Sequence, residues 1–218
     1  WAAGQAQVSE PSSTPGPPST YTPAPTNAAI ILHYTGGSWA LAYELPSAQI
    51  NQISMGSSTD GWAIGSVESW NTSKSGPIGS ATPLLLRYTG GGWATASEPR
   101  SGTATWTPGE QSVLAVSATD VWLATVNEPP NQDATTTTIT FLHDDGSGFL
   151  PATVTLDGRQ SANIAAISML SPTEGWAVGT AYWPRKYGVP SGAGPGYTPT
   201  ITPLILHFHN GMWSVALD

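Results

Sequence analysis

The stretch Gly61-Trp62-Ala63-Ile64-Gly65 decides the fold, because it returns along the chain at a nearly constant interval. It recurs as Gly175-Trp176-Ala177-Val178-Gly179 and, more loosely, as Val121-Trp122-Leu123-Ala124-Thr125, and the chain opens on the same element at Trp1-Ala2-Ala3-Gly4. The four tryptophans are spaced by 61, 60 and 54 residues. A period of this length predicts an array of similar structural units.

Three further elements keep phase with this tryptophan motif. Ahead of it lie a short apolar strand and a polar turn that ends in a carboxylate: Ile53-Ser54-Met55 before Asp60, Ala115-Val116-Ser117 before Asp120, and Ile167-Ser168-Met169 before Glu174. After it comes an apolar strand that contains His33, Arg87, His143 or His207. A turn then leads to a last strand that opens on Trp39, Trp93, Phe149 or Trp213. Each unit therefore holds four short strands separated by turns.

Four short antiparallel strands in a repeat of roughly 40 to 60 residues are typical of one blade of a β-propeller. A single blade cannot bury both of its faces, so such units stack on one another. An irregular β-sandwich is the alternative, but the four elements in phase argue against it. We therefore predict an all-β propeller with a partial N-terminal blade (1–45) and three complete blades (46–99, 110–156 and 162–218).

The first unit lacks the strand that precedes the tryptophan in the other three. Its motif strand would then be an open edge, which proteins usually cover. We expect the propeller to be completed in one of two ways: by further blades of a longer chain, which we favour, or by a strand from another copy.

These residues resemble a known group of proteins. The order Ser-x-x-Asp/Glu-Gly-Trp-Ala-Val-Gly, a variable loop, Ile-Leu-His-aromatic and Gly-Gly-x-Trp is similar to bacterial exported β-propeller repeats of the photosystem II stability/assembly-factor-like group. It resembles Asp-box (BNR) repeats more distantly, since their order Ser-x-Asp-x-Gly-x-x-Trp is not reproduced. The resemblance covers most of the chain and implies a propeller fold, while the functions of such repeats are diverse.

The composition limits what the protein can be. Only 9% of residues are charged, the net charge is −8, and there are 24 Gly and 20 Pro. This excludes a coiled coil or a helical bundle and makes nucleic-acid binding and membrane insertion unexpected. The absence of Cys removes disulfides, zinc-thiolate sites and thiol nucleophiles. The low Lys content and the Ser/Thr/Pro/Gly-rich segments suit an exported protein, extracellular or on the cell surface, whose signal segment is not in this chain.

The long connections after the tryptophan strands (9–27, 68–83, 127–138 and 182–203) are expected as loop inserts on one face, where loops commonly carry function. Aromatic residues outside the repeat are the candidate contacts for a ligand or partner: Trp70, Trp106, Trp183, Tyr187, Tyr21 and Tyr197. Alternatively, these side chains fold back and anchor their own loops. Candidate glycosylation sites are Asn71, in a sequon, and Thr14 and Thr22, in a Ser/Thr/Pro-rich segment that otherwise reads as a solvated loop.

Residues that recur in every unit are expected to be structural. The repeat tryptophans are predicted to pack between blades: Trp1, Trp62, Trp122, Trp176, Trp39, Trp93 and Trp213. The histidines at the shared position lie in different blades and cannot hold one ion together, which leaves His209 as the only histidine outside the repeat. We therefore expect no metal site and no cofactor.

Catalysis is not expected either. The chain has no Gly-x-Ser-x-Gly elbow and no Cys nucleophile, and it has only four arginines for a substrate carboxylate. The sequence favours a non-enzymatic binding or assembly scaffold with a protein partner, one that can self-associate through β-augmentation. Two alternatives remain open: a propeller that binds glycans or cleaves glycosides with two loop carboxylates, and an assembly factor for a membrane complex.

Overall fold

The computed structural model describes residues 1–8, 26–73, 76–97, 111–127, 136–159, 161–183 and 200–217. These residues form strands and the turns between them, with no helix in the described part. All strand pairs are antiparallel, and each sheet is built from consecutive strands. The predicted all-β class with four-stranded antiparallel sheets is confirmed.

The first of the four sheets has three strands and the others have four. Sheet 1 holds β1 (Ala2–Val8), β2 (Thr26–Thr35) and β3 (Ser38–Pro46). Sheet 2 holds β4 (Ala48–Met55), β5 (Gly61–Ser73), β6 (Gly76–Tyr88) and β7 (Trp93–Thr95). Sheet 3 holds β8 (Gln111–Ala115), β9 (Val121–Asn127), β10 (Thr136–Asp144) and β11 (Phe149–Asp157). Sheet 4 holds β12 (Ser161–Ser171), β13 (Glu174–Tyr182), β14 (Ile201–His209) and β15 (Met212–Leu217).

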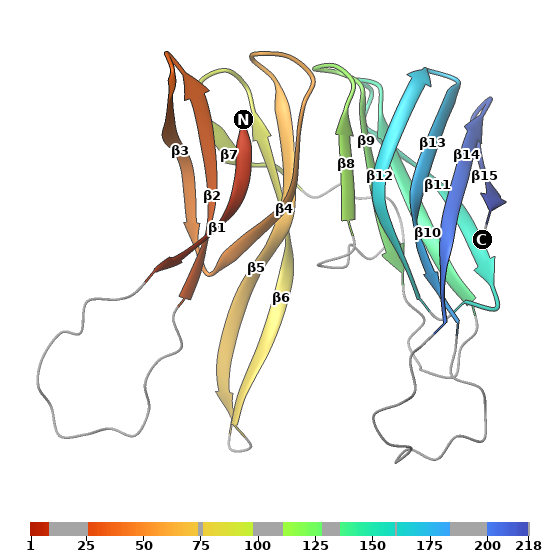
Figure 1. Ribbon diagram of the computed structural model, residues 1–218, viewed down its shortest axis with the longest axis horizontal. Coiled ribbons are helices and arrows are strands. Elements are labelled where there is room, and N and C mark those ends of the chain that lie inside the picture. Colours follow the sequence, from red (N-terminus) through yellow and green to blue (C-terminus); the bar gives the residue numbers. More distant parts are fainter. Residues whose placement is uncertain are drawn as a thin grey trace, which may run out of the picture.

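The sheets follow one another through the molecule in chain order. Sheets 1 and 2 form the red-to-yellow side of Figure 1, and sheets 3 and 4 form the green-to-blue side. The hydrophobic core has three parts, one between each pair of successive sheets. Strand β9 shows the consequence: Trp122 and Ala124 pack toward sheet 4, whereas Val121 and Leu123 pack toward sheet 2. A strand covered on both faces is apolar throughout, unlike a strand with one wet face.

The first strands of the sheets lie side by side, β4 against β8 and β8 against β12. Since β8 is an edge strand of sheet 3, its outward backbone N–H groups need partners from outside the sheet. Side chains of β4 supply them: Gln52 Oε1 accepts from the Val113 N–H at 2.8 Å, and Ser54 Oγ accepts from the Ala115 N–H at 2.9 Å. Neighbouring sheets are therefore joined by hydrogen bonds as well as by apolar contact.

The last glycine of the tryptophan motif accompanies a bulge. The register of β4 slips between Ile50 and Gln52, opposite Gly65, and that of β12 slips at the equivalent place opposite Gly179. A Cβ at either glycine would overlap a backbone carbonyl oxygen of the partner strand. The β8–β9 pair has no slip, and there the same position is Thr125. The third copy of the motif therefore lacks this glycine because its strand pair has no bulge at this position.

Two expectations from the sequence need correction. The strand equivalent to Ile53-Ser54-Met55 is Val113-Leu114-Ala115 rather than Ala115-Val116-Ser117, because Leu114 pairs with Trp122 as Ser54 pairs with Trp62. Ser117 belongs to the turn, where its Oγ accepts the Thr119 N–H at 3.2 Å. The same Ser-to-Thr bond recurs in the turns of sheets 2 and 4. The sequence interpretation was wrong because it placed Ser117, a polar turn residue, in the strand.

The connection 68–83 is a strand extension rather than a loop. The β5–β6 ladder continues from Glu68↔Ala81 to Ser73↔Gly76, and this hairpin reaches beyond the neighbouring strands in Figure 1. Its Ser, Gly and Pro residues are typical of loops, but the antiparallel register of the two strands carries on through them.

At one cross-strand position, the sizes of the two paired side chains change together from sheet to sheet. Met55 faces Gly61 in sheet 2 and Met169 faces Gly175 in sheet 4, whereas Ala115 faces Val121 in sheet 3. At both glycines a Cβ would collide with the methionine sulfur. The space between the two strands is thus filled either by a methionine that lies over a glycine or by the shorter side chains of an alanine and a valine.

This pairing predicts the outcome of a double-mutant cycle. Gly61→Val should destabilise the protein by about 1–3 kcal/mol, because Met55 must leave its place. Adding Met55→Ala recreates the pair of sheet 3 and should restore at least about 1 kcal/mol relative to the sum of the two single changes. Equilibrium urea unfolding measures both. Gly4→Val is the control, since nothing lies within 4 Å of a Cβ at Gly4; simple additivity in the cycle would contradict the packing described.

Candidate functional site

The tryptophan of each repeat motif lies against a cross-strand side chain of the following strand. In three sheets this partner is a histidine whose ring is stacked on the indole, and in sheet 2 it is a guanidinium. The pairs are Trp1–His33 with ring centroids 4.0 Å apart, Trp122–His143 at 3.9 Å, Trp176–His207 at 4.1 Å, and Trp62–Arg87 with the guanidinium carbon 4.9 Å from the ring centroid.

The carboxylate at the preceding turn completes the group. The Asp60 carboxylate lies 3.1 Å from Arg87, Asp120 lies 3.0 Å from His143, and Glu174 lies 2.6 Å from His207. Arg87 Nη2 also donates to the Ala118 carbonyl oxygen of the next sheet at 3.0 Å. The recurrence of this group makes it part of the framework, as the sequence suggested for the turn carboxylates.

Each sheet has a forward face, which bears this tryptophan, and a backward face, which bears the aromatic residue of its last strand. The forward Trp1 meets Tyr88 and Trp93 of sheet 2, with ring centroids 4.7 and 5.6 Å away. The same contact recurs between sheets 2 and 3 and between sheets 3 and 4. It joins Trp62 to Phe149 at 6.2 Å, and Trp122 to Phe208 and Trp213 at 4.9 and 5.9 Å. The three interfaces thus share one scheme, a forward tryptophan on a backward aromatic residue.

The two end faces carry the same residues without a neighbouring sheet among the described residues. On the backward face of sheet 1, Trp39 is 53% exposed, whereas its equivalents Trp93 and Trp213 are 8% and 7% exposed. Its contact with Tyr34 has the same spacing as the buried Tyr88–Trp93 contact, 5.2 against 5.4 Å. Of the seven repeat tryptophans, Trp62, Trp93, Trp122 and Trp213 are therefore buried and Trp1 is half-buried, while Trp39 and Trp176 are exposed.

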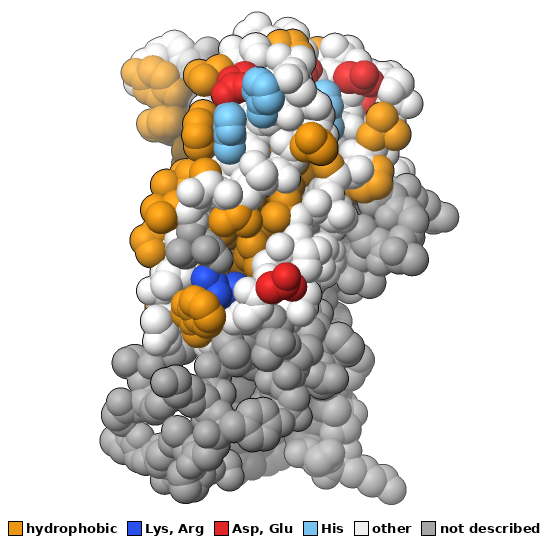
Figure 2. All heavy atoms as spheres, turned by 90° about the vertical axis from the view of Figure 1, so that its right-hand side faces the viewer, with side chains coloured by type: hydrophobic (Ala, Val, Ile, Leu, Met, Phe, Trp, Pro, Cys, Tyr) orange, Lys and Arg blue, Asp and Glu red, His pale blue; other side chains and the backbone are white. Residues whose placement is uncertain are grey.

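The forward face of sheet 4 is the second uncovered surface. Trp176 and Val178 are 37% and 43% exposed, and alternation along β13 places both on this face. The cross-strand register adds Ile205 opposite Val178 and Ile201 further along β14. Figure 2 views this side of the molecule and shows hydrophobic side chains over the sheet, with histidine and carboxylate side chains gathered at one end.

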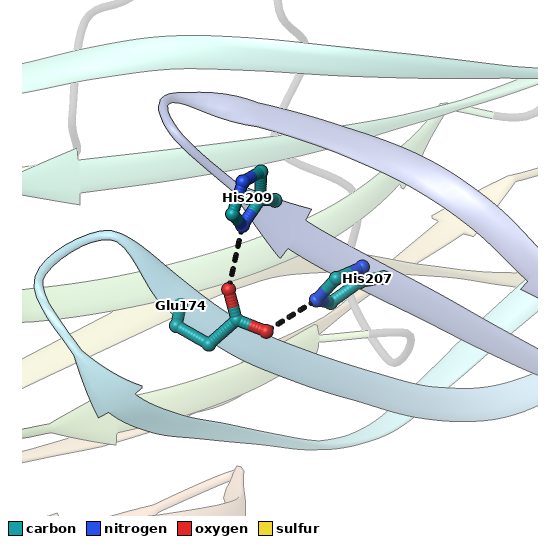
Figure 3. A group of neighbouring side chains, drawn as sticks. All are labelled: Glu174, His207 and His209. Atoms are coloured by element: carbon teal, nitrogen blue, oxygen red, sulfur yellow. Dashed lines mark hydrogen bonds and ion pairs between the residues drawn. The ribbon is translucent and has the colours of Figure 1, made fainter.

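That end holds the one group among the described residues that could bind a metal ion: Glu174, His207 and His209 (Figure 3). Glu174 lies 2.6 Å from His207 Nε2 through Oε1 and 2.7 Å from His209 Nδ1 through Oε2. Hydrogen bonds, first from His209 and then from His207, lower the pKa of the Glu174 carboxyl below its ordinary value. Asn210 Nδ2 lies 2.8 Å from the other ring nitrogen of His209.

Sequence reasoning had considered the histidines alone and had treated Glu174 as a turn residue. The missed signal is the register, which sets Glu174 directly opposite His209. The positions equivalent to His209 in sheets 1, 2 and 3 are Thr35, Thr89 and Asp145.

Of the aromatic candidates from the inserts, only Trp183 has a described side chain. Trp183 lies over Arg159, with the guanidinium carbon 3.3 Å from its ring centroid. Arg159 is buried, so Trp183 anchors its own segment. Only backbone is described for Trp70 and Asn71, which belong to β5. Outside the described residues lie Tyr21, Trp106, Tyr187, Tyr197, Thr14 and Thr22.

Comparison with known protein families, curated proteins and solved structures gives no match. The described part of the chain contains no helix with the length and apolarity that crossing a membrane requires.

The framework group predicts a contrast between two substitutions of Arg87. Arg87→Leu leaves the buried Asp60 carboxylate without its counter-charge and should cost about 2–3 kcal/mol of unfolding free energy. Arg87→His installs the residue that the other three sheets use and should cost less than half as much. Urea unfolding of the two variants at pH 7 measures the difference; equal losses would show that a histidine does not replace Arg87 as the partner of Asp60.

Proposed function

We propose that this protein is a non-enzymatic scaffold of the β-propeller type, and that each of its two end faces binds another sheet of the same kind. One observation carries the proposal: the uncovered faces of sheets 1 and 4 are the two halves of the interface that occurs three times inside the molecule. In a solution of this chain the partner is a second copy, bound head to tail. Such a contact builds a closed ring or an open filament, depending on the rotation between copies.

The apolar surface that association would cover sets the expected affinity between two copies. Tyr34, Trp39 and Leu41 on one face, and Trp176 and Val178 on the other, are about half exposed. Covering them contributes about 1 kcal/mol each, or about 5 kcal/mol together. Aromatic contacts like those of Trp1 with Tyr88 and Trp93 add about 0.5–1.5 kcal/mol each. Set against a cost of association whose lower estimates are about 4 kcal/mol, the total predicts weak association, with a dissociation constant of about 1 mM.

The setting we propose is outside the cell or on its surface. The low Lys content, the Ser/Thr/Pro/Gly-rich segments and the resemblance to exported repeats support it. The contact of Trp183 with Arg159 favours a loop anchor over a free platform for sugar rings. The histidines of the described sheets lie in framework groups or beside Glu174, which supports a binding role over nucleophilic catalysis.

Head-to-tail association is testable with one variant for each face. Sedimentation velocity from about 10 μM to 1 mM should show the wild-type chain growing in size with concentration. Trp39→Lys and Val178→Lys each introduce a charge on one face and should remain monomeric, because the remaining intact face finds no partner. Mixed together, they should form dimers and nothing larger, since each variant supplies the face that the other lacks.

Leu150→Lys is the matched control: it alters an exposed leucine on sheet 3, which has a neighbour on both sides, and should associate like the wild type. A wild-type chain that stays monomeric throughout this range contradicts the proposal. So does a mixture of the two face variants that forms no dimer.

A further inference from the structure

We propose that Glu174, His207 and His209 bind one divalent transition-metal ion, with Zn²⁺ as the natural candidate and with Cu²⁺ and Ni²⁺ as other ions that fit. Two imidazole nitrogens and one carboxylate oxygen form a donor set that these ions prefer, whereas Ca²⁺ and Mg²⁺ prefer oxygen donors alone. This inference concerns a site that the scaffold function does not require.

The geometry needs little adjustment. The three ligand atoms lie within 4.8 Å of one another. Around a tetrahedral Zn²⁺ with bonds of about 2.0–2.1 Å, ligand atoms are about 3.3 Å apart. The side chain of His209 is 62% exposed and is free to turn by the small amount required. Both imidazoles already point at the same carboxylate (Figure 3).

The ligands are held by regular structure rather than by a loop. His207 and His209 are two residues apart on β14 and so project from one face of the sheet. Glu174 is the first residue of β13, opposite His209. The stacked indole of Trp176 fixes the ring plane of His207. Ligands on paired strands are positioned more accurately than ligands on a connection.

The third ligand distinguishes this group from its counterparts. In sheet 3, Asp120 and His143 repeat the carboxylate–histidine pair, but the next position on that face is Asp145, whose carboxylate bonds to Ser147. In sheet 2 the pair is Asp60 and Arg87, and an arginine offers no lone pair to a metal. Glu174 with both histidines is thus a local addition to the repeated framework.

Metal binding moves protons within the rings. Without metal, His207 Nε2 and His209 Nδ1 carry the N–H groups that donate to Glu174, as hydrogen-bond geometry assigns them. When neutral rings bind a metal through these nitrogens, each proton transfers to the other ring nitrogen, with no net release. His209 Nε2 then donates, and a flip of the Asn210 amide presents Oδ1 as its acceptor. Asn210 therefore acts as a positioning residue for His209.

With three protein ligands, a tetrahedral ion keeps one position for water or for a donor from another molecule. The three ligands lie on the uncovered forward face of sheet 4, where His207 is stacked on Trp176.

Isothermal titration with ZnCl₂ tests the site. The titrated protein is the tag-free Trp39→Lys variant, which keeps the forward face of sheet 4 unchanged, at concentrations where it is monomeric. We expect one Zn²⁺ per chain and no heat of binding with CaCl₂ or MgCl₂. His209→Thr, which installs the residue of sheets 1 and 2, should weaken Zn²⁺ binding at least about tenfold, as loss of one of three ligands requires. The control His143→Gln removes the sheet 3 equivalent of His207 and should leave both affinity and stoichiometry unchanged.

Two outcomes would overturn the proposal: a parent chain that binds no Zn²⁺ below about 1 mM, or a His209→Thr variant that binds as tightly as its parent. Loss of binding in His143→Gln would also overturn it, because the ion would then lie elsewhere. Zn²⁺-induced shifts of imidazole NMR signals give a second readout and should be confined to two of the four histidines. None of these results depends on whether the end faces associate.

Discussion

The structure depends on the contact between a tryptophan on the forward face of one sheet and an aromatic residue on the backward face of the next. It recurs at every junction between successive sheets, as Trp1 on Trp93, Trp62 on Phe149 and Trp122 on Trp213. Because an interior sheet takes part in two such contacts, its strands are apolar on both faces. The hydrogen bonds from β4 to the edge of β8 add direction to this apolar packing. A sheet at either end keeps one half of the contact uncovered.

Repetition separates structural residues from residues with another role. The stacked Trp–His or Trp–Arg pair with its turn carboxylate occurs in sheet after sheet, and it explains histidines and acids that would otherwise suggest an active site. Departures from the repeat are of two kinds. Some are compensated, as when Ala115 and Val121 replace a methionine over a glycine. His209 is different, since it adds a nitrogen beside a carboxylate that already has a partner.

Much of the fold could be predicted from the sequence. The phase of the tryptophan motif and of the turns around it indicated four short antiparallel strands per unit, and these sheets are present. The errors arose where register matters: β8 was displaced by two residues, and the ladder of β5 and β6 was taken for a loop. For the same reason Glu174 and His209 were not paired, because a single strand does not reveal which residue lies opposite. The exposure of Trp39 and Trp176 was not foreseen either, since the sequence motif is the same at an end as in the interior.

Hydroxyl-radical footprinting of the tryptophans over a range of protein concentrations tests most directly whether the end faces bind one another. It reports the solvent exposure of each tryptophan separately. We predict that Trp39 and Trp176 react in dilute solution and become protected together as the concentration rises. Trp62 and Trp122, which are buried between sheets, should be protected throughout. If Trp39 and Trp176 remain equally reactive at every concentration, the end faces are not halves of an interface between copies of this chain.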